Sequence, residues 1–238
     1  MKYSFNSRIR FSETGEDGKL KITSLVNYFQ DCSNFHSNSL DMGAEALRKK
    51  GRVWVLSSWQ VEVERLPKEG EDVKISTWAY DFKGFYGYRN YTMETSDGER
   101  LAYANSIWVY LNADNGMPLK VDIEEVEGYG IEEKLEMNYA PRKVAIPGQS
   151  ITKESFTVQP CDLDLNHHVN NGRYIVMAEK YLPSGFEVGQ MRAEYKHQAT
   201  LGKTIIPYIS EVEGKITVAL CDEEQNPYAV VEFKEGVL

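Results

Sequence analysis

The sequence predicts an α+β fold built from two tandem repeats, each a long helix wrapped by a curved antiparallel β-sheet. Two observations predict it. The hydrophobic pattern changes from helical spacing to a period of two, and this change occurs once in each half of the chain. Each half also presents its elements in the same order, which is one strand, one helix and then strands only. Because a long helix must bury its apolar face, we expect it to pack against the sheet that follows.

In the first half, residues 2–11 predict a strand. Four apolar residues then fall on one face of a helix, and two hydroxyl residues before them are candidates for its N-cap. These residues are Leu25, Phe29, Cys32 and Phe35, with Thr23 and Ser24 before them. From Val53 the period changes to two, as in a half-buried antiparallel strand. Further strands are predicted over residues 72–82, 84–95 and 100–111, where Tyr, Trp, Val and Ile are frequent.

The second half repeats this order. A strand is predicted over residues 153–158, and a helix from about His168 to Tyr181. Strands are expected near residues 186–197, 203–212, 215–220 and 227–233. The halves also share a local pattern. Val61-Glu62-Val63 stands at the same distance before Gly70 as Ala193-Glu194-Tyr195 stands before Gly202.

The composition changes between the two halves. Residues 112–150 contain the turn sequence Asn115-Gly116, three of the eight prolines and an acidic run at residues 122–127. This composition is typical of a segment that crosses the surface between domains. We therefore predict an N-terminal repeat over residues 1–130, a linker over 131–150 and a C-terminal repeat over 151–238.

The bulk composition indicates a globular protein, which we expect in the cytoplasm. The chain is 42% hydrophobic and 26% charged, and no apolar run reaches the roughly 20 residues that a membrane-spanning helix needs. Its first residues lack the apolar core of a secretory signal. Three scattered cysteines, Cys32, Cys161 and Cys221, indicate reduced thiols. The net charge of −9 argues against nucleic acid or an anionic membrane as a partner.

One polar run, from Cys161 to Ile175, carries the strongest functional signal. It gathers two carboxylates, three Asn residues and two of the four His residues at the predicted start of a helix. Asn and Asp are typical N-caps, but capping needs only one such residue and no imidazole. The N-terminus of a helix also favours an oxyanion. We therefore interpret the run as a catalytic site rather than as a cap.

Motifs in both halves resemble one known family. The first-half motifs are Tyr28-Phe29-Gln30-Asp31, Trp54-Val55-Leu56-Ser57 and Thr77-Trp78. The second-half motifs are Asp164-x-Asn166-x-His168-Val169-Asn170-Asn171, followed by Tyr174-Ile175, and then Glu194-Tyr195-Lys196. Together they are similar to the acyl-[acyl carrier protein] thioesterases of plants and bacteria over nearly the whole chain. The resemblance implies a double hotdog fold, in which each repeat wraps a sheet around one helix.

The resemblance also implies an activity, which is hydrolysis of a fatty acyl-[acyl carrier protein] thioester with release of free fatty acid. The catalytic Asp, Asn and His of the family correspond to Asp164, Asn166 and His168. After the Glu-Tyr-basic run the family places a Glu and, in many plant members, a Cys, where this chain has Gln198 and Ala199. The implied partner is the acyl carrier protein. The oligomeric state stays open, because the tandem already supplies both halves and so allows a monomer, whereas the resemblance favours a homodimer. In the family, the first repeat surrounds the acyl chain.

Each catalytic candidate has a hypothetical role. Asp164 is the general base for a water that attacks the thioester carbonyl, or, as the less favoured alternative, attacks the carbonyl directly to form a short-lived anhydride. His168 orients that water or Asp164, or protonates the leaving thiolate. The Asn166 amide holds water or the carbonyl oxygen. Gln198 can orient a water but cannot accept its proton.

Other residues of the run are expected to bind the substrate. The backbone N–H groups near Val169 and Asn170 are candidate oxyanion donors, and Asn171 and Tyr174 complete the expected binding residues. Cys161 is expected to be buried in a strand and unreactive. No cofactor is predicted. A metal site is not predicted either, because the acid and imidazole groups follow no familiar ligand spacing.

Three alternatives stay open. The substrate could be an acyl-CoA instead of an acyl carrier protein. A hydroxyacyl dehydratase also uses His and a carboxylate on this fold, although the placement of Asp164 and His168 in the same half favours hydrolysis. A third alternative is a non-enzymatic acyl-binding protein, disabled at Gln198.

Overall fold

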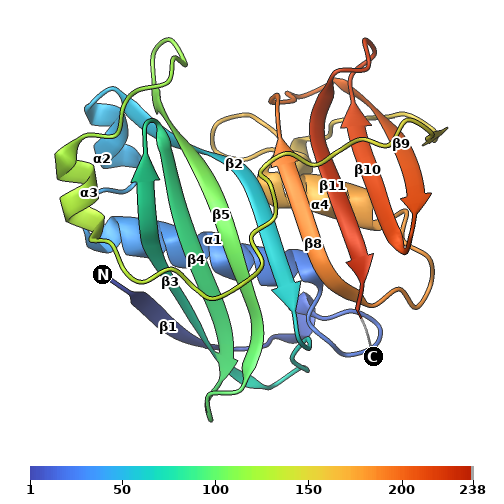
Figure 1. The fold of residues 1–238 in the computed structure, drawn as a ribbon. Coiled ribbons are helices and arrows are strands. Elements are labelled where there is room, and N and C mark those ends of the chain that lie inside the picture. The colour runs from blue at the N-terminus through green and yellow to red at the C-terminus, as the bar shows by residue number, and fades with distance from the viewer. Residues whose placement is uncertain (237–238) are drawn as a thin grey trace. The chain divides into compact units, whose positions relative to one another are not determined.

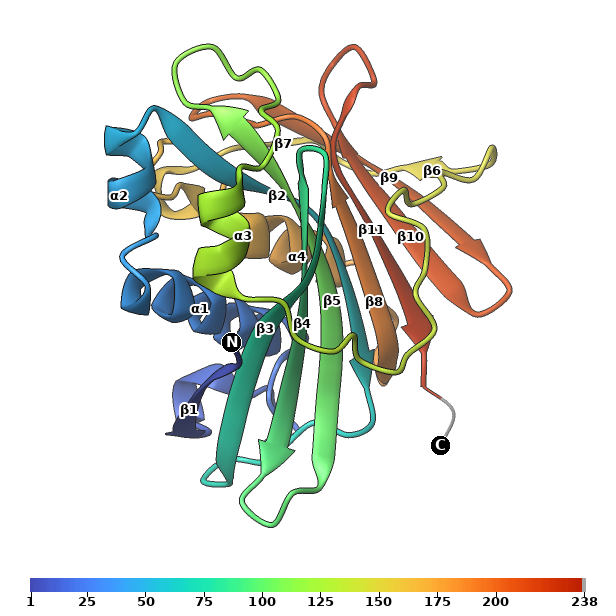
Figure 2. The same ribbon diagram turned by 60° about the vertical axis from the view of Figure 1, so that its left-hand side comes forward.

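The structure is a computed structural model that describes residues 1–236 of the 238-residue chain. These residues form two compact units. The first comprises residues 1–57 and 61–140, and the second comprises residues 58–60 and the described residues from 141 onward. Each unit packs a helix against antiparallel strands, as Figure 1 and Figure 2 show. The predicted α+β class is confirmed.

The sheet of the first unit has the strand order β1-β3-β4-β5-β2. Its strands are β1 (Tyr3–Arg8), β2 (Arg52–Val63), β3 (Asp72–Lys83), β4 (Tyr86–Thr95) and β5 (Arg100–Asn112). Antiparallel pairing joins β1 to β3, β3 to β4 and β4 to β5. Its helices are α1 (Ile22–Ser39), α2 (Ala44–Lys49) and α3 (Ile123–Tyr129), and a 3-10 helix η1 (Phe11–Glu13) precedes α1.

Helix α1 packs on this sheet through the apolar face that the sequence predicts. Leu25, Phe29 and Cys32 are buried, and the Phe29 ring lies 5.3 Å from that of Tyr91 on β4. Phe35 differs from the prediction, because it is 44% exposed, with its ring edge-to-face against Phe5 of the edge strand β1. The predicted caps also differ. Helix α1 begins at Ile22, so that Thr23 and Ser24 lie inside its first turn.

The second unit has the strand order β8-β11-β10-β9-β6, and β7 also pairs with β9. Its strands are β6 (Ile151–Thr152), β7 (Phe156–Thr157), β8 (Val188–Tyr195), β9 (Thr204–Val212), β10 (Lys215–Cys221) and β11 (Pro227–Glu235). A 3-10 helix η2 (Pro160–Asp162) precedes α4 (Asn171–Glu179). Helix α4 packs on β10 and β11, where Ile175, Ala178, Val218 and Val230 are fully buried.

The predicted strand over residues 153–158 is interrupted in the structure. Two short strands, β6 and β7, pair with β9 on either side of Pro207. Proline has no N–H to donate to a ladder, so the pairing is broken opposite it. Lys153 still donates its N–H to the Pro207 carbonyl at 2.9 Å.

Residues 131–140 form no regular element, yet hydrogen bonds fix them to β3 and β4. The Asn90 side chain of β4 is fully buried and accepts hydrogen bonds from the Leu135 N–H at 3.1 Å and the Tyr139 hydroxyl at 2.9 Å. Trp78 of β3 donates its indole N–H to the Glu133 carbonyl at 2.8 Å. This segment, which the sequence assigns to a linker, is therefore held to the sheet of the first unit.

Replacing Asn90 tests this attachment. Asn90→Ala removes the acceptor of two hydrogen bonds and the donor of a third, to the Ala104 carbonyl at 3.1 Å. We expect the free energy of unfolding in urea to fall by about 3 kcal/mol, because these groups lose their partners in a buried place. Asn6→Ala on the exposed side of β1 is the control and should change it by less than about 0.5 kcal/mol. Equal effects of both substitutions would contradict the attachment.

Candidate functional site

The predicted site residues lie in a short loop between η2 and α4, residues 163–170, which we call the polar loop. Backbone hydrogen bonds close it at both ends. They run from Asp164 N to His168 O (2.8 Å), His167 N to Asp164 O (3.1 Å), Val169 N to Ala199 O (2.9 Å) and Asn170 N to Asp162 O (2.9 Å). His167 has a φ of +61°, which lets the chain turn tightly at this point. The loop is therefore fixed by its own backbone and by the β8–β9 connection.

A buried carboxylate anchors the polar loop. Asp162 is only 5% exposed, and its Oδ1 accepts hydrogen bonds from Nε and Nη2 of Arg173 at 3.0 and 2.8 Å. Its Oδ2 accepts the Gln159 N–H at 2.9 Å. Asp162 thus ties η2 to the first turns of α4.

The structure brings Asp164 and Asn166 together. Oδ1 of Asp164 accepts the Asn166 N–H at 2.7 Å and the His168 N–H at 3.3 Å. Oδ2 accepts a hydrogen bond from Nδ2 of Asn166 at 3.3 Å. Asp164 is half-buried and Asn166 is exposed. The carboxylate is thus held in one orientation, with room for a further donor at Oδ2.

His168 presents a nitrogen that the protein does not satisfy. The residue is half-buried, and its Nδ1 is buried without a hydrogen-bond partner among residues 1–236. Buried polar atoms are nearly always paired, so this nitrogen is a candidate position for a bound water or substrate group. The neighbouring His167 is exposed.

Capping of α4 does not account for these residues. The Asn170 side chain caps the helix by accepting the Gly172 N–H at 2.8 Å. One residue therefore does what the cap requires. Asp164, Asn166 and His168 take no part in it.

The predicted oxyanion donors need correction. The N–H of Val169 is used by the Ala199 carbonyl, and that of Asn170 by the Asp162 carbonyl, so neither can bind a substrate oxygen. The reason is the tight closure of the loop, which consumes both donors. The N–H of Asn171, the first residue of α4, has no acceptor among the described residues.

Tyr174 links α4 to the β8–β9 connection that pairs with the polar loop. It is 2% exposed, and its hydroxyl accepts the Ala199 N–H at 3.1 Å. Burial raises the pKa of Tyr174 to about 12 and the pKa of Tyr195 above its ordinary value. The Tyr195 hydroxyl donates to the Asn171 carbonyl at 3.1 Å. These two tyrosines fix the start of α4, and this placement makes Tyr174 a scaffold residue rather than a binding residue.

Gln198 and Cys161 are both exposed. Gln198 lies in the β8–β9 connection, directly before Ala199. Because Ala199 pairs with Val169 in an antiparallel register, Gln198 lies opposite Asn170. Its side chain has no hydrogen-bond partner among the described residues and is free to bind water. The exposure of Cys161 contradicts the predicted burial, because this residue lies in η2 and not in a strand.

Comparison with known proteins identifies the family. Residues 1–129 match the acyl-ACP thioesterase N-terminal domain, and residues 147–228 match the acyl-ACP thioesterase C-terminal domain. The chain belongs to the acyl-ACP thioesterase family. It is 31% identical over 218 residues to a chloroplastic palmitoyl-acyl carrier protein thioesterase of Gossypium hirsutum, covering 82% of this chain and 52% of that protein.

Solved structures of acyl-ACP thioesterases share the fold over the full chain. The acyl-ACP thioesterase from Bacteroides thetaiotaomicron superposes with a TM-score of 0.91 at 20% identity, covering 99% of this chain and 98% of that one. The 12:0-ACP thioesterase from Umbellularia californica has a TM-score of 0.85 at 20% identity, covering 98% and 96%. The predicted double hotdog is confirmed. The chain spans about half the length of the curated relatives it matches, and no helix within residues 1–236 has the length and apolarity to cross a membrane.

This thioesterase-family chain contains a second copy of the polar loop, residues 14–21 between η1 and α1, which we call the counterpart loop. Its backbone hydrogen bonds are the same. They run from Gly15 N to Lys19 O (2.9 Å), Gly18 N to Gly15 O (3.1 Å), Leu20 N to Pro67 O (2.8 Å) and Lys21 N to Glu13 O (3.0 Å). Gly18 has the positive φ of His167, at +71°.

The two loops differ in the side chains that carry chemistry. At the positions of Asp164, Asn166 and His168, the counterpart loop has Gly15, Asp17 and Lys19. The sequence does not reveal the second loop, because the copies share a backbone path and almost no side chains. Besides the repeated order of elements, the shared spacing before Gly70 and Gly202 is the sequence signal of the duplication. Each glycine lies two residues after a position that forms a β-bridge with one of the loops, Lys68 with Lys19 and Thr200 with His168.

The comparison of the loops generates a stability prediction for His167. A side chain at positive φ costs about 1 kcal/mol relative to glycine, and the counterpart loop already has glycine there. Because a new glycine also costs about 0.5 kcal/mol in chain entropy, we expect His167→Gly to raise the free energy of unfolding by about 0.5 kcal/mol. The control is His197→Gly, at an exposed position without positive φ, which should lower it by about 0.5–1 kcal/mol. If His167→Gly is as destabilising as the control, the strain at His167 is not real.

Proposed function

We propose that this chain hydrolyses the thioester of a fatty acyl-[acyl carrier protein] and releases free fatty acid and the holo-carrier. The observation that supports this most is the contrast between the two loops. One backbone frame occurs twice, and only the copy before α4 has an oriented carboxylate, an amide and an imidazole with an unpaired nitrogen. Family membership supports the reaction class.

The carboxylate of Asp164 acts as the general base. Its Oδ1 is occupied by backbone N–H groups, so Oδ2 is the oxygen that can accept a proton from water. The water oxygen forms a bond to the thioester carbonyl carbon as its proton moves to Asp164. The Asn166 amide, at 3.3 Å from Oδ2, keeps that oxygen in place.

The start of α4 stabilises the negative charge that develops on the carbonyl oxygen. The N–H of Asn171 replaces the donors that the sequence suggested, since it has no acceptor within the described chain. A positioned donor of this kind lowers the barrier by about 3 kcal/mol. The positive end of the helix dipole acts in the same direction.

His168 completes the reaction. When the tetrahedral intermediate collapses, the carbon–sulfur bond breaks and the leaving thiolate takes a proton from the imidazolium form of His168. Asp164 then passes the proton that it took from the attacking water to the His168 imidazole through a water molecule, so both groups return to their starting state and the net products are the carboxylic acid and the thiol. Gln198 binds the attacking water through its side-chain amide. Because an amide cannot accept a proton at neutral pH, this leaves the base to Asp164.

A thiol-release assay tests the proposed function. The protein is incubated with acyl carrier protein and CoA substrates of graded acyl length, and free thiol is followed. Thiol release from the acyl carrier substrates supports the proposal. Faster release from acyl-CoA would show that acyl-CoA is the preferred substrate. Formation of an enoyl product would show that the protein is a dehydratase and not a hydrolase. Tight binding without turnover would show that the chain is a non-enzymatic acyl-binding protein.

Substitutions in the loop test the assigned roles. Asp164→Asn keeps the acceptor for the loop N–H groups but removes the base, and His168→Ala removes the proton donor. Each should lower kcat about 100-fold or more, while the thermal midpoint changes by less than about 3 °C. The control is Asp17→Asn in the counterpart loop, which should leave kcat unchanged. Full activity of Asp164→Asn would show that another group is the base.

A further inference from the structure

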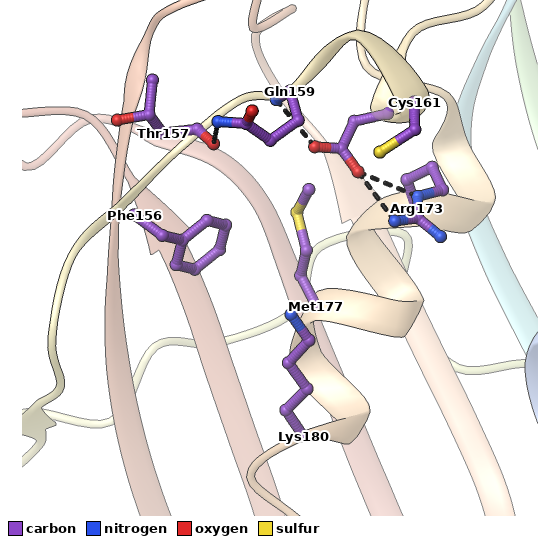
Figure 3. Close-up of a pocket in the computed structure, with 8 residues that line it drawn as sticks. Phe156, Thr157, Gln159, Cys161, Arg173, Met177 and Lys180 are labelled. Atoms are coloured by element: carbon purple, nitrogen blue, oxygen red, sulfur yellow. Dashed lines mark hydrogen bonds and ion pairs between the residues drawn. The ribbon is translucent and has the colours of Figure 1, made fainter.

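A pocket beside the polar loop has no role in the mechanism above. It lies within the second unit between β7, η2 and α4 and has a volume of about 390 Å³. Figure 3 shows its walls. They are formed by Phe156, Thr157, Gln159, Cys161, Asp162, Arg173, Met177 and Lys180.

The pocket offers positive charge in a chain whose net charge is −9. Lys180 is exposed; its ammonium group lies 5.5 Å from the centre of the Phe156 ring and has no carboxylate partner among residues 1–236. Arg173 donates hydrogen bonds from Nε and Nη2 to Asp162, and its Nη1 has no acceptor among residues 1–236. The wall thus has two cations and one carboxylate, and that carboxylate is already engaged.

The rest of the lining is suited to an uncharged chain with amide groups. Phe156 is half-buried and Met177 is buried, so both give apolar contact. Gln159 donates a side-chain Nε2–H to the Thr157 carbonyl at 3.0 Å, and its side chain also accepts the Asp162 N–H in the capping box of η2. The pocket therefore combines an anion site, an apolar wall and a side-chain amide.

The first unit shows that this pocket is not a necessary result of the fold. At the positions of Met177 and Lys180, counted from the starts of α4 and α1, the first unit has Tyr28 and Asp31. Tyr28 is buried and donates its hydroxyl hydrogen to Glu13 at 2.8 Å, and Phe5 stacks on its ring. Glu13 itself occupies the position of Asp162. The equivalent place is filled by a tyrosine, and the charge at its mouth is reversed.

We propose that the pocket binds the phosphopantetheine arm that carries the thioester, with the phosphate at Lys180 and Arg173 and the pantetheine amides and methyl groups along Phe156, Met177 and Gln159. This rests on the proposed function, because it names the part of that substrate bound outside the reacting bond. Asp162 forms both the pocket wall and the anchor of the polar loop, two residues before Asp164. An arm seated here is held beside the loop that performs the chemistry.

The binding test needs no turnover. S-methyl phosphopantetheine, which has no thioester and no free thiol, is titrated into the protein by calorimetry, with S-methyl pantetheine as the probe without phosphate. Cys161 provides a second readout, because it is exposed in the pocket wall. Burial shields the other two thiols and raises the pKa of Cys32 to about 12 and that of Cys221 to about 11. Iodoacetamide should therefore modify Cys161 first, and the phosphorylated probe should slow this reaction.

Two variants place the residues of the first unit in the pocket and test which part of it binds the phosphate. Lys180→Asp gives the pocket the residue of its counterpart and should weaken binding of the phosphorylated probe about tenfold or more, without affecting the probe that lacks phosphate. Met177→Tyr should fill the pocket and remove binding of both probes. Lys74→Asp makes the same charge change on the exposed side of β3 and should leave both affinities unchanged. If Met177→Tyr does not fold, Lys180→Asp still decides the matter.

The outcomes separate this inference from the proposed function. No protection of Cys161, or equal affinities in Lys180→Asp and the unchanged protein, would overturn the pocket assignment even if thioesters are hydrolysed. Specific binding without hydrolysis would support the pocket and overturn the function. Carrier and CoA share this arm, so the KM of Lys180→Asp should rise for whichever of the two is the substrate, with kcat nearly unchanged.

Discussion

The closed backbone frame of the polar loop is the constraint on which the site depends. Four short hydrogen bonds fix residues 163–170 to η2, to themselves and to the β8–β9 connection. Asp162 extends this frame by tying η2 to Arg173 in α4. A buried carboxylate that loses its partner is strongly destabilising, so the ion pair and the loop are maintained together. The position of Asp164 is thereby determined by groups that take no part in the reaction.

The same frame in the first unit shows how the two repeats have diverged. Hydrogen bonds between backbone groups do not require particular side chains at most positions. The first unit therefore has the same frame with Gly15, Asp17 and Lys19 at the positions of the acid, the amide and the imidazole. The pocket beside the loop also differs between the two units. In the second unit it is open and lined by cations, and in the first it is closed by Tyr28 bonded to Glu13. The chemistry and the open pocket both belong to one copy.

The sequence predicts much of this arrangement from local patterns. Helical spacing locates α1 and α4, alternation locates the long strands, and the density of Asp, Asn and His before α4 locates the loop. What it misses depends on contacts distant in the chain. The N–H groups of Val169 and Asn170 look available until the loop closes onto Ala199 and Asp162. Cys161 looks like a strand residue until η2 exposes it.

The attachment of residues 131–140 is invisible in the sequence for a similar reason. Its charged and proline-containing neighbourhood is typical of a linker, whereas the group that fixes it, Asn90, lies in the middle of β4. The counterpart loop is hidden because only its backbone is repeated. Its positive φ at Gly18, equivalent to that of His167, becomes meaningful once the two hydrogen-bond patterns are compared.

The most direct measurement exchanges the chemistry of one loop for that of the other. A chain with Asp164→Gly, Asn166→Asp and His168→Lys carries the residues of the counterpart loop on a frame that already accepts them. Single-turnover hydrolysis of an acyl carrier thioester is then followed together with urea unfolding. The account predicts a folded protein with almost unchanged stability and no measurable hydrolysis. Hydrolysis at the original rate would contradict it.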